Sequence, residues 1–456
     1  MAQTSRTGKK NGRQTQTGIT RITVCGYKSI AEKQSVEIRP LTILAGANSS
    51  GKSSMLQPLL LMKQTLEAGY DPGTLLLNGK ILKFTEWKQL LPQTDACNDA
   101  CQLQIGIEVN GQSTLTTCFG RTDGQSLEVQ EMVYDDPGDP ITLRRGMTNK
   151  EIEKALPAEL RKLPVSITSK RSGPMQWTVT PRLCFLYLAL VPTRGKREEP
   201  WSGILASPSL DVEPHIRNII HLPGLRGNPE RDYPVTSSAG SPFSGTFQVY
   251  TAGVINKWQE EKRSEGKGKL AELRDQLVKL GLTWTVEARR VDDTRVELRV
   301  GRLPRRRRGG EEDLVSIADV GLGTSQVLPV LVALLAAKPG QMVYMEQPEI
   351  HLHPNAQHVL AQMLIDAAKR GVRVVAETHS SLLIRGVQTH VAEGKLDPAQ
   401  VKLHWFGRRE DGSTEITSRD LDESGAFGDW PEDFDRVELD AQIRYLDAAE
   451  KKLKTA

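Results

Sequence analysis

The sequence predicts an α/β fold, a mixed sheet flanked by helices, with an inserted α+β lobe. Two features predict the sheet. An apolar run at 41–45 leads into a glycine-bounded loop and then into a segment, 54–66, whose apolar residues recur every three or four positions. Two later apolar runs, 341–345 and 372–376, end in charged residues, as buried parallel strands do. Alternating patterns between 96 and 310 predict the lobe.

The composition is that of a globular chain without a membrane segment. Of its 456 residues, 38% are hydrophobic and 25% are charged, which is typical of such proteins. The longest apolar run, 327–337, contains Pro329 and is shorter than the roughly 18 residues of a membrane helix. Residues 1–17 are polar and lack an apolar core, so we expect a disordered tail and no secretory signal. We therefore expect a cytoplasmic protein with no membrane partner.

The cysteines and the net charge say little about partners. The five cysteines are an odd number, and Cys97 and Cys101 have no second pair at zinc spacing, so we expect reduced thiols. The net charge of +4 is small, but five arginines lie between Arg302 and Arg308. Such a run is usually a solvated loop, and contact with DNA or an acidic partner is the alternative.

The loop after the first apolar run reads GANSSGKS and fits the P-loop pattern G-x-x-x-x-G-K-S over residues 46–53. Its glycines let backbone N–H groups turn inward toward phosphate oxygens. Lys52 would bridge the β- and γ-phosphates, and the Ser53 hydroxyl would bind Mg²⁺. A chance glycine loop before a helix is the alternative, and the flanking strand and helix patterns count against it.

Between the P-loop and residue 310 the chain alternates strand and helix signals. Asn110-Gly111 between two alternating runs predicts a tight hairpin. Gln64 and Gln89 are the candidates for a glutamine that senses Mg²⁺ and the γ-phosphate. Further strands are predicted at 19–24, 34–38, 127–134, 177–179, 284–288 and 295–300, and helices at 150–163, 250–257 and 270–280. The helix with Leu270, Leu273, Leu277 and Leu280 is short, so long coiled-coil arms are not expected.

A second glycine-rich segment, 319–326, reads DVGLGTSQ and opens an apolar helix at 327–337. Free N–H groups, the Ser325 hydroxyl and the positive end of the helix dipole suit an anion. Because one P-loop already takes the triphosphate of its own subunit, we expect this segment to cap the γ-phosphate held by another subunit. A glycine-rich helix start without a ligand is the alternative.

Polar residues follow each of the two later strands. Glu346 and Glu349 lie at or just after the end of the first, where a carboxylate can complete a Mg²⁺ shell or take a proton from the attacking water. His379 ends the second strand and can bond the γ-phosphate and that water. His351 and His353 lack a third ligand, so we do not expect zinc.

This order of motifs resembles the ATP-binding-cassette (ABC) head of the SMC/RecF-like superfamily. More narrowly, EQPEIHLHP, DVGLGTSQVLP and ETHS resemble the bacterial AAA-family ATPases, which include the overcoming-lysogenization-defect nucleases, the Septu ATPase and the ATPase subunit of the PARIS anti-phage system. Residues 416–425 and 429–434 are similar to a C-terminal module of one branch. The resemblance implies head segments at 18–95 and 311–410, the lobe at 96–310 and the C-terminal module at 411–456.

The resemblance also implies the ligands and their residues. ATP and Mg²⁺ are the implied cofactors, Ser53 and Glu346 the metal ligands, and Glu346, Glu349 and His379 the catalytic candidates. Nucleotide contacts are implied for Asn48, Ser50, Gly51, Lys52, Ser53 and Ser54, and for Gly323 and Ser325 from the neighbouring subunit. One departure stands out: the ABC pattern ends its strand in Asp-Glu, whereas this chain has Glu346 and Gln347. Since glutamine cannot accept a proton, either Glu346 or Glu349 is the base or hydrolysis is slow.

Three functions remain open on these observations. The favoured one is a cytoplasmic ATPase that forms at least a dimer with shared ATP sites and controls a separate effector in phage defence. We do not expect a nuclease domain in this chain, because Asp420 and Asp422 lack the upstream glutamate of a TOPRIM domain. A separate TOPRIM-type nuclease is therefore the expected effector. DNA or a phage protein would be the trigger. The alternatives are a RecF-like ATPase that binds DNA directly and a nucleotide-binding scaffold with little turnover.

Overall fold

The computed structural model describes residues 17–92, 102–122, 126–137, 140–156, 175–192, 205–235, 243–261, 264–303, 305, 313–428 and 443–447. Some sequence-based expectations fall outside these residues: the tail at 1–16, Cys97, Cys101, the arginines at 306–308 and the segment 429–434. None of the described helices is long and apolar enough to cross a membrane.

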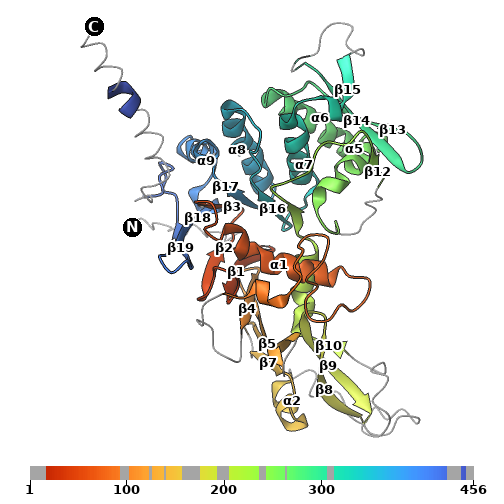
Figure 1. Cartoon of the computed structure of the whole chain (residues 1–456), viewed down its shortest axis with the longest axis vertical. Coiled ribbons are helices and arrows are strands. Elements are labelled where there is room, and N and C mark those ends of the chain that lie inside the picture. The colour runs from red at the N-terminus through yellow and green to blue at the C-terminus, as the bar shows by residue number, and fades with distance from the viewer. Residues whose placement is uncertain are drawn as a thin grey trace, which may run out of the picture.

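A six-stranded mixed sheet forms the centre of the molecule, as predicted (Figure 1). Five strands run parallel and the last is antiparallel. In spatial order they are β11 (Ile220–Leu222), β16 (Met342–Glu346), β17 (Arg373–Thr378), β3 (Leu41–Gly46), β18 (Val401–Arg408) and β19 (Thr414–Arg419). Every residue of β3 and β17 is buried, which explains why both strands are mainly apolar in their central residues.

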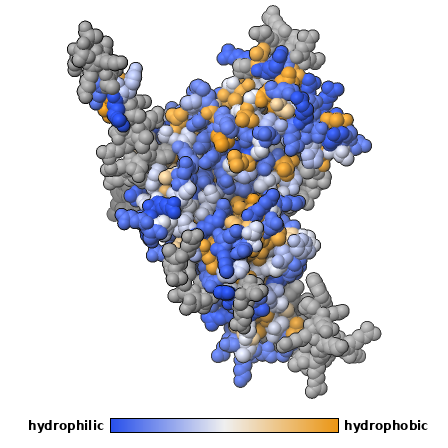
Figure 2. All heavy atoms as spheres, viewed as in Figure 1, coloured by the Kyte–Doolittle hydropathy of each residue, from blue (hydrophilic) through white to orange (hydrophobic). Residues whose placement is uncertain are grey.

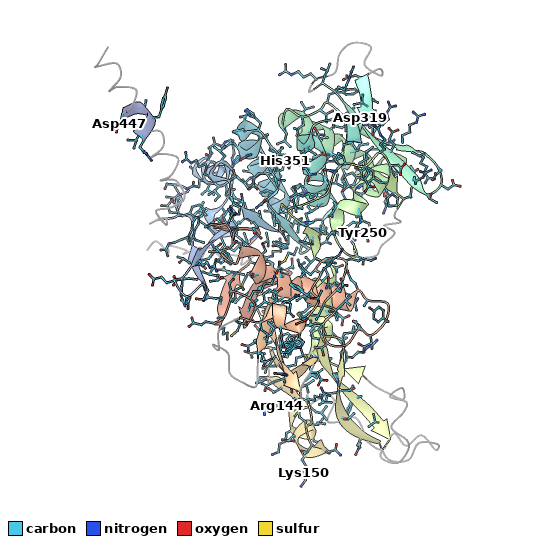
Figure 3. All side chains as sticks on the ribbon, viewed as in Figure 1. Arg144, Lys150, Tyr250, Asp319, His351 and Asp447 are labelled. Atoms are coloured by element: carbon cyan, nitrogen blue, oxygen red, sulfur yellow. The ribbon has the colours of Figure 1, made fainter. Side chains whose placement is uncertain are left out.

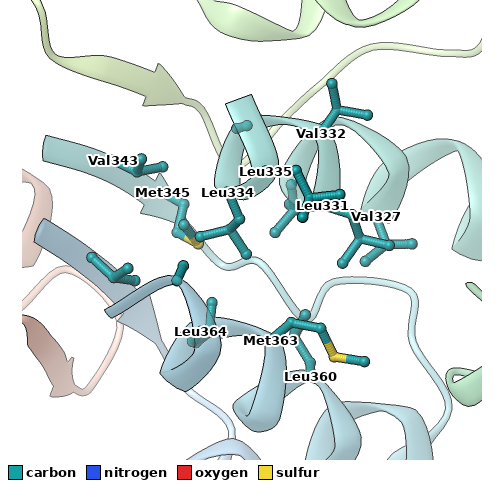
Figure 4. Close-up of a cluster of buried hydrophobic side chains, with 14 of the residues drawn as sticks. Val327, Leu331, Val332, Leu334, Leu335, Val343, Met345, Leu360, Met363 and Leu364 are labelled. Carbon is teal, nitrogen blue, oxygen red and sulfur yellow. The ribbon is translucent and has the colours of Figure 1, made fainter. Parts of the chain in front are cut away.

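Alternate residues of the central strands face two separate cores. Ile43 and Met345 belong to the core under α7 (Leu322–Ala336), α8 (Pro354–Lys369) and α9 (Ser381–Ala392). Figure 4 shows this core between α7, α8 and the sheet. Leu44 and Tyr344 face the other way, onto α1 (Lys52–Leu66) and the antiparallel sheet. Because successive side chains of a strand point to opposite faces of the sheet, each face is covered by one of the two cores.

A second six-stranded sheet is wholly antiparallel and packs on the α1 side. Asn110 and Gly111 have φ angles of 57° and 66°, so the predicted tight hairpin is confirmed. Its strands, in spatial order, are β2 (Gln34–Glu37), β1 (Ile19–Cys25), β4 (Leu103–Val109), β5 (Ser113–Thr122), β6 (Ser126–Asp135) and β7 (Ile141–Arg144).

The remaining helices and strands lie between residues 149 and 316. The helices are α2 (Asn149–Ala155), α4 (Glu213–Arg217), α5 (Thr251–Glu260) and α6 (Ser264–Lys279). The strands are β8 (Met175–Arg182), β9 (Phe185–Pro192), β10 (Leu205–Ala206), β12 (Tyr233–Pro234), β13 (Val286–Arg290), β14 (Arg295–Gly301) and β15 (Leu314–Ser316). Short 3-10 turns lie at Trp87–Leu90, Pro208–Asp211, Phe247–Tyr250, Ile317–Asp319 and Pro398–Gln400. On the face shown in Figure 2, apolar side chains are interspersed with hydrophilic ones.

The sheets do not follow the segment boundaries expected from the sequence. β1 and β4 are hydrogen-bonded neighbours across the expected boundary at 95/96. β11, inside the expected lobe, pairs with β16 of the central sheet. Pairing between strands far apart in sequence depends on tertiary contacts, which local patterns do not encode. Each of these two sheets therefore joins segments on either side of an expected boundary.

Three local expectations differ from the structure. Helix α7 begins at Leu322, so Gly323 and Ser325 lie within its first turn and not in a preceding loop. The helix expected at 150–163 ends at Ala155 within the described residues. Cys118 is disulfide-bonded, which corrects the expectation of reduced thiols for that residue. The spacing of cysteines along the sequence can indicate a metal site, but it cannot predict a disulfide whose cysteines are brought together by tertiary contacts. Cys184 is a buried free cysteine.

His404 ties the central sheet to β2 through a fully buried ring. Its Nδ1 lies 2.7 Å from the Ser418 hydroxyl, and its Nε2 lies 2.8 Å from the Glu37 carbonyl oxygen. The carbonyl can only accept, so Nε2 carries the proton and Nδ1 accepts from serine in a neutral ring. Burial lowers the pKa of His404 to about 4.

We expect this histidine to make the fold acid-sensitive. The folded-state pKa lies below the unfolded value of about 6.5, so its full contribution is present above that pH. It is lost as the pH falls from about 6.5 to 4, at a cost of about 3 kcal/mol in the free energy of unfolding. Denaturant unfolding at pH 7.5 and pH 4 should show a smaller pH difference in His404→Gln than in wild type. His353→Gln, at an exposed histidine, is the matched control, and equal pH differences in all three proteins would contradict the assignment.

Candidate functional site

The P-loop connects β3 to α1, as the sequence predicts. Gly46, Ser49 and Gly51 have φ angles of 143°, 59° and 97°, so the backbone turns repeatedly through conformations that bring N–H groups to one side. A Cβ on Gly46 would lie 2.3 Å from the Phe406 carbonyl oxygen, and one on Gly51 would lie 2.2 Å from the Thr414 hydroxyl. Both glycines are therefore required by conformation and by space.

Lys52 is buried at the base of this loop. Its Nζ donates to the carbonyl oxygens of Gly46, at 3.0 Å, and Ala47, at 2.7 Å. Burial lowers the pKa of Lys52, and the nearby Glu377 carboxylate opposes that shift. Ala47, Asn48 and Ser49 are exposed, so the loop presents its backbone to solvent above the lysine. Ser50 is buried, and Ser54 is half-buried in the first turn of α1.

The Ser53 hydroxyl lies against a carboxylate on β17, the neighbouring strand. Its Oγ is 2.9 Å from Glu377 Oε1 and 3.0 Å from Oε2. The Tyr344 hydroxyl donates to Glu377 Oε2 at 3.0 Å, and Glu377 is 6% exposed. Burial, followed by the charge of Glu346, raises the pKa of Glu377. Glu377 was not predicted from the sequence, although it is a carboxylate at the end of a strand, as Glu346 is.

Glu346 sits beside Glu377 but has different partners. The two are paired in register across β16 and β17. Glu346 Oε1 is 3.2 Å from His221 Nε2, and its Oε2 accepts from the Gly224 amide at 3.2 Å. His221 stacks on Tyr344 with ring centroids 5.3 Å apart. Burial raises the pKa of Glu346, but the hydrogen bonds from His221 and Gly224 outweigh it, so the pKa is lowered overall.

Glu349 and His379 form a second cluster at the same edge. Glu349 Oε1 accepts from the Thr378 hydroxyl at 2.6 Å and from the His379 amide at 3.3 Å. Burial raises the pKa of Glu349. The His379 ring is half-buried near the P-loop: burial and then Lys52 lower its pKa, and the Gly46 carbonyl opposes this. Glu349 and His379, two of the three catalytic candidates, thus lie together at the end of β17, the strand beside β3.

Arg226 connects the strand-end carboxylates to α7. This arginine is 8% exposed. Its guanidinium donates to the carbonyl oxygens of Gln326 at 3.3 Å, Glu346 at 2.8 Å and Gln347 at 3.1 Å. Burial lowers its pKa to about 10, opposed by Glu349 and Glu346. Nothing in its local sequence distinguishes Arg226 from a surface arginine, so sequence analysis missed it.

The start of α7 is exposed on one side. Gly321 is exposed and Leu322 is 41% exposed, whereas Ser325 is 9% exposed and donates to the Leu322 carbonyl at 3.1 Å. A Cβ on Gly323 would lie 3.1 Å from the His351 carbonyl oxygen, so the glycine permits close packing on the loop after β16. Figure 3 labels Asp319, just before this helix, and His351, in that loop.

Other sequence candidates have structural partners. Gln64 lies three helical turns beyond Lys52 and binds the backbone of Leu76, Ile81 and Leu82, so it is not placed to sense the γ-phosphate. Gln89 is bonded to Thr85. Asp420 pairs with Arg39 and Lys402. Among the described residues, no group of three or more His, Cys, Asp or Glu side chains is arranged to hold a metal.

The comparisons with known proteins agree with this site in part. Residues 267–385 match the family described as "AAA domain, putative AbiEii toxin, Type IV TA system". The matched segment contains Glu346, Glu349 and His379 but not the P-loop. No curated protein matches the chain.

Among solved structures, the chain is similar to heads of SMC proteins. An SMC head bound to the C-terminal winged-helix domain of ScpA is 13% identical, with 89% of this chain and 99% of that chain covered and a TM-score of 0.45. The SMC head domain from Thermotoga maritima is 12% identical, with 88% and 98% covered and a TM-score of 0.39. The Smc head with an extended coiled coil, bound to the C-terminal domain of ScpA from Pyrococcus furiosus, is 10% identical, with 95% and 99% covered and a TM-score of 0.42.

The P-loop, the parallel sheet and the matched AAA segment support an ATPase of the P-loop class. In such a protein nucleotide and Mg²⁺ bind at the carboxyl edge of the sheet, where the structure gathers Lys52, Ser53, Glu346 and His379.

We expect Arg226→Met to lower the free energy of unfolding by about 2–4 kcal/mol, because it leaves buried carbonyl oxygens unpaired. Arg231→Ala is the matched control: Arg231 also forms an ion pair, with Asp319, but its side chain is 74% exposed. The control should cost less than about 1 kcal/mol. Urea denaturation measures both, and equal losses would show that Arg226 is not a buried connection.

Proposed function

We propose that this protein binds and hydrolyses ATP with Mg²⁺, that nucleotide drives its assembly into at least a dimer, and that it controls a separate effector in defence against phage. The observation that carries the ATPase proposal is the gathering of Lys52, Ser53, Glu346 and His379 at one edge of the sheet. The P-loop supplies phosphate-binding groups, and the adjacent carboxylates supply oxygen ligands of the kind Mg²⁺ prefers.

The donor set fits a divalent cation. Ser53 offers a hydroxyl, and Glu346 and Glu377 are neighbouring carboxylates that repel each other. Mg²⁺ bound there would neutralise charge on the phosphates. Asn48, Ser50, Gly51 and Ser54 line the rest of the loop and the first turn of α1.

The residues proposed for catalysis belong to the P-loop and to the segments at the ends of β16 and β17. Lys52 would exchange its bonds to the Gly46 and Ala47 carbonyls for phosphate oxygens. His379, directly after the strand beside β3, would bond the γ-phosphate or the attacking water. For the general base, Glu346 and Glu349 both stay candidates, and Gln347 favours slow turnover because an amide cannot take the proton.

The exposed start of α7 supports shared sites between subunits. Gly321 and Leu322 lie on the surface, and the first turn carries Gly323 and Ser325 with the unpaired N–H groups of a helix N-terminus. We propose that this turn caps the γ-phosphate held by the neighbouring subunit. A TOPRIM-type nuclease is the proposed effector and DNA or a phage protein the proposed trigger, both on the resemblance to defence ATPases alone.

Two alternative functions, a nucleotide-binding scaffold and a RecF-like ATPase, can each be distinguished from the proposed function by one measurement. Gln347 favours a nucleotide-binding scaffold, for which turnover would equal that of Lys52→Ala. A RecF-like ATPase would show DNA-stimulated hydrolysis. Within the part of the arginine run that is described, Arg302 already pairs with Asp313 and Arg305 is exposed, so Arg305→Ala tests the DNA contact.

We expect Lys52→Ala to reduce ATP turnover by about 100-fold or more, since a positive charge on the transferred phosphoryl group is lost. Steady-state phosphate release measures this. The buried Lys63 is the matched control because it bonds Glu67 and two backbone carbonyls away from the site. Lys63→Met should alter stability, with turnover per folded molecule retained. Unchanged turnover in Lys52→Ala would exclude the P-loop as the ATPase site.

We expect Ser325→Arg to abolish the nucleotide-dependent increase in mass, because a long cation in the first turn of α7 would block a neighbouring P-loop. Light scattering with and without a non-hydrolysable ATP analogue measures the mass. Binding of the analogue to the separate subunit should remain. If Ser325→Arg assembled and hydrolysed ATP as wild type does, the shared-site proposal would be contradicted.

A further inference from the structure

The residue that faces the Ser53 hydroxyl is Glu377, not Glu346. Both Glu377 carboxylate oxygens lie within 3.0 Å of Ser53 Oγ. The P-loop serine is the group that binds Mg²⁺ in P-loop proteins. A carboxylate that already shares this hydroxyl needs only a small rearrangement to share a cation with it. Glu377 therefore stands where a metal ligand is required.

Glu346 is engaged on the far side by the lobe. One of its carboxylate oxygens contacts His221 and the other accepts from the Gly224 amide. Both partners come from β11 or the segment just after it, and His221 is 2% exposed. Removing Glu346 from these partners would leave a buried amide and a buried ring nitrogen without a hydrogen bond, which is costly. Glu346 is thus held back from Ser53 by the lobe.

The charges at this edge are unbalanced in favour of a cation. Glu346 and Glu377 lie side by side, and Lys52 is the cation whose charge acts on Glu377. The Tyr344 hydroxyl donates to Glu377 at 3.0 Å and lies 3.5 Å from Glu346 Oε1, so one hydroxyl serves two carboxylates. Mg²⁺ is commonly bound by one or two carboxylates together with substrate phosphates. The two carboxylates at this edge therefore carry negative charge that Lys52 alone does not balance, and a bound cation would balance it.

We propose that Glu377, together with Ser53, is the carboxylate through which this site holds its divalent cation, while Glu346 orients it from behind through Tyr344. This inference rests on the proposed ATP-binding function. It assigns to β17 the metal-binding role that the sequence pattern assigns to the end of β16, and it makes Glu346 a positioning residue.

The test compares two isosteric changes at neighbouring carboxylates, Glu377→Gln and Glu346→Gln. Binding of Mn²⁺ in the presence of a non-hydrolysable ATP analogue is followed by electron paramagnetic resonance. Analogue binding without metal is measured separately by calorimetry. Thermal melting of the free protein reports whether Glu377 is only a structural anchor for α1.

We expect Glu377→Gln to weaken Mn²⁺ binding by at least about tenfold and by more than Glu346→Gln does. Metal-free analogue binding should be unchanged because Lys52 is intact. The melting temperature of the free protein should not fall, because the amide keeps a hydrogen bond to Ser53 and removes repulsion from Glu346.

Three results would overturn the inference: Mn²⁺ affinity of Glu377→Gln within twofold of wild type, a larger loss in Glu346→Gln, or a lowered melting temperature with Mn²⁺ affinity unchanged. If Glu377→Gln lost ATP turnover but bound Mn²⁺ with full affinity, Glu377 would be a general base and the proposed metal-ligand role would be wrong. If wild type itself binds no analogue, the proposed ATP-binding function fails, and that outcome is distinct from the others.

Discussion

The parallel pairing of β3, β17 and β16 is the constraint on which the site depends. In this register Glu377 lies opposite both Leu44 on one side and Glu346 on the other, so the three strands end together beside the P-loop. Lys52 and Ser53 begin the helix that follows β3. Groups from two ends of a long chain therefore meet because their strands point the same way. The two buried cores hold this sheet from both faces and keep the register fixed.

Because the charged groups at this edge are buried or half-buried, each is stabilised by hydrogen bonds to specific residues. Lys52 is bonded to two loop carbonyls, Glu346 to His221 and Gly224, and Glu349 to Thr378 and His379. Arg226 supplies hydrogen bonds to both α7 and the loop after β16. His221 and Gly224 lie in the segment between the P-loop and β16, so this segment supplies the partners of the strand-end carboxylate Glu346. Without them the Glu346 carboxylate would lose these two hydrogen-bond partners.

The structure shows which groups surround Gln347, the residue that departs from the ABC pattern. The position that usually carries the base holds an amide with a φ of 45°, and its backbone N–H bonds the Glu377 carbonyl. A carboxylate nonetheless stands one strand closer to the P-loop. The carboxylates of this edge are thus distributed over β16 and β17, and a motif read along one strand includes only some of them.

Local pattern alone was enough for the P-loop, the buried strands, the Asn110-Gly111 hairpin and the helix with Leu270, because turn geometry and side-chain period depend on neighbours in sequence. The roles of Glu377, Arg226 and His221, and the joining of lobe to head through β11, came only with the folded chain. Their partners lie far away in sequence, and no local rule states which strands pair or which polar groups are buried together. Spacing along the chain can place a carboxylate at the end of a strand, but only the packed sheet decides which carboxylate meets the serine.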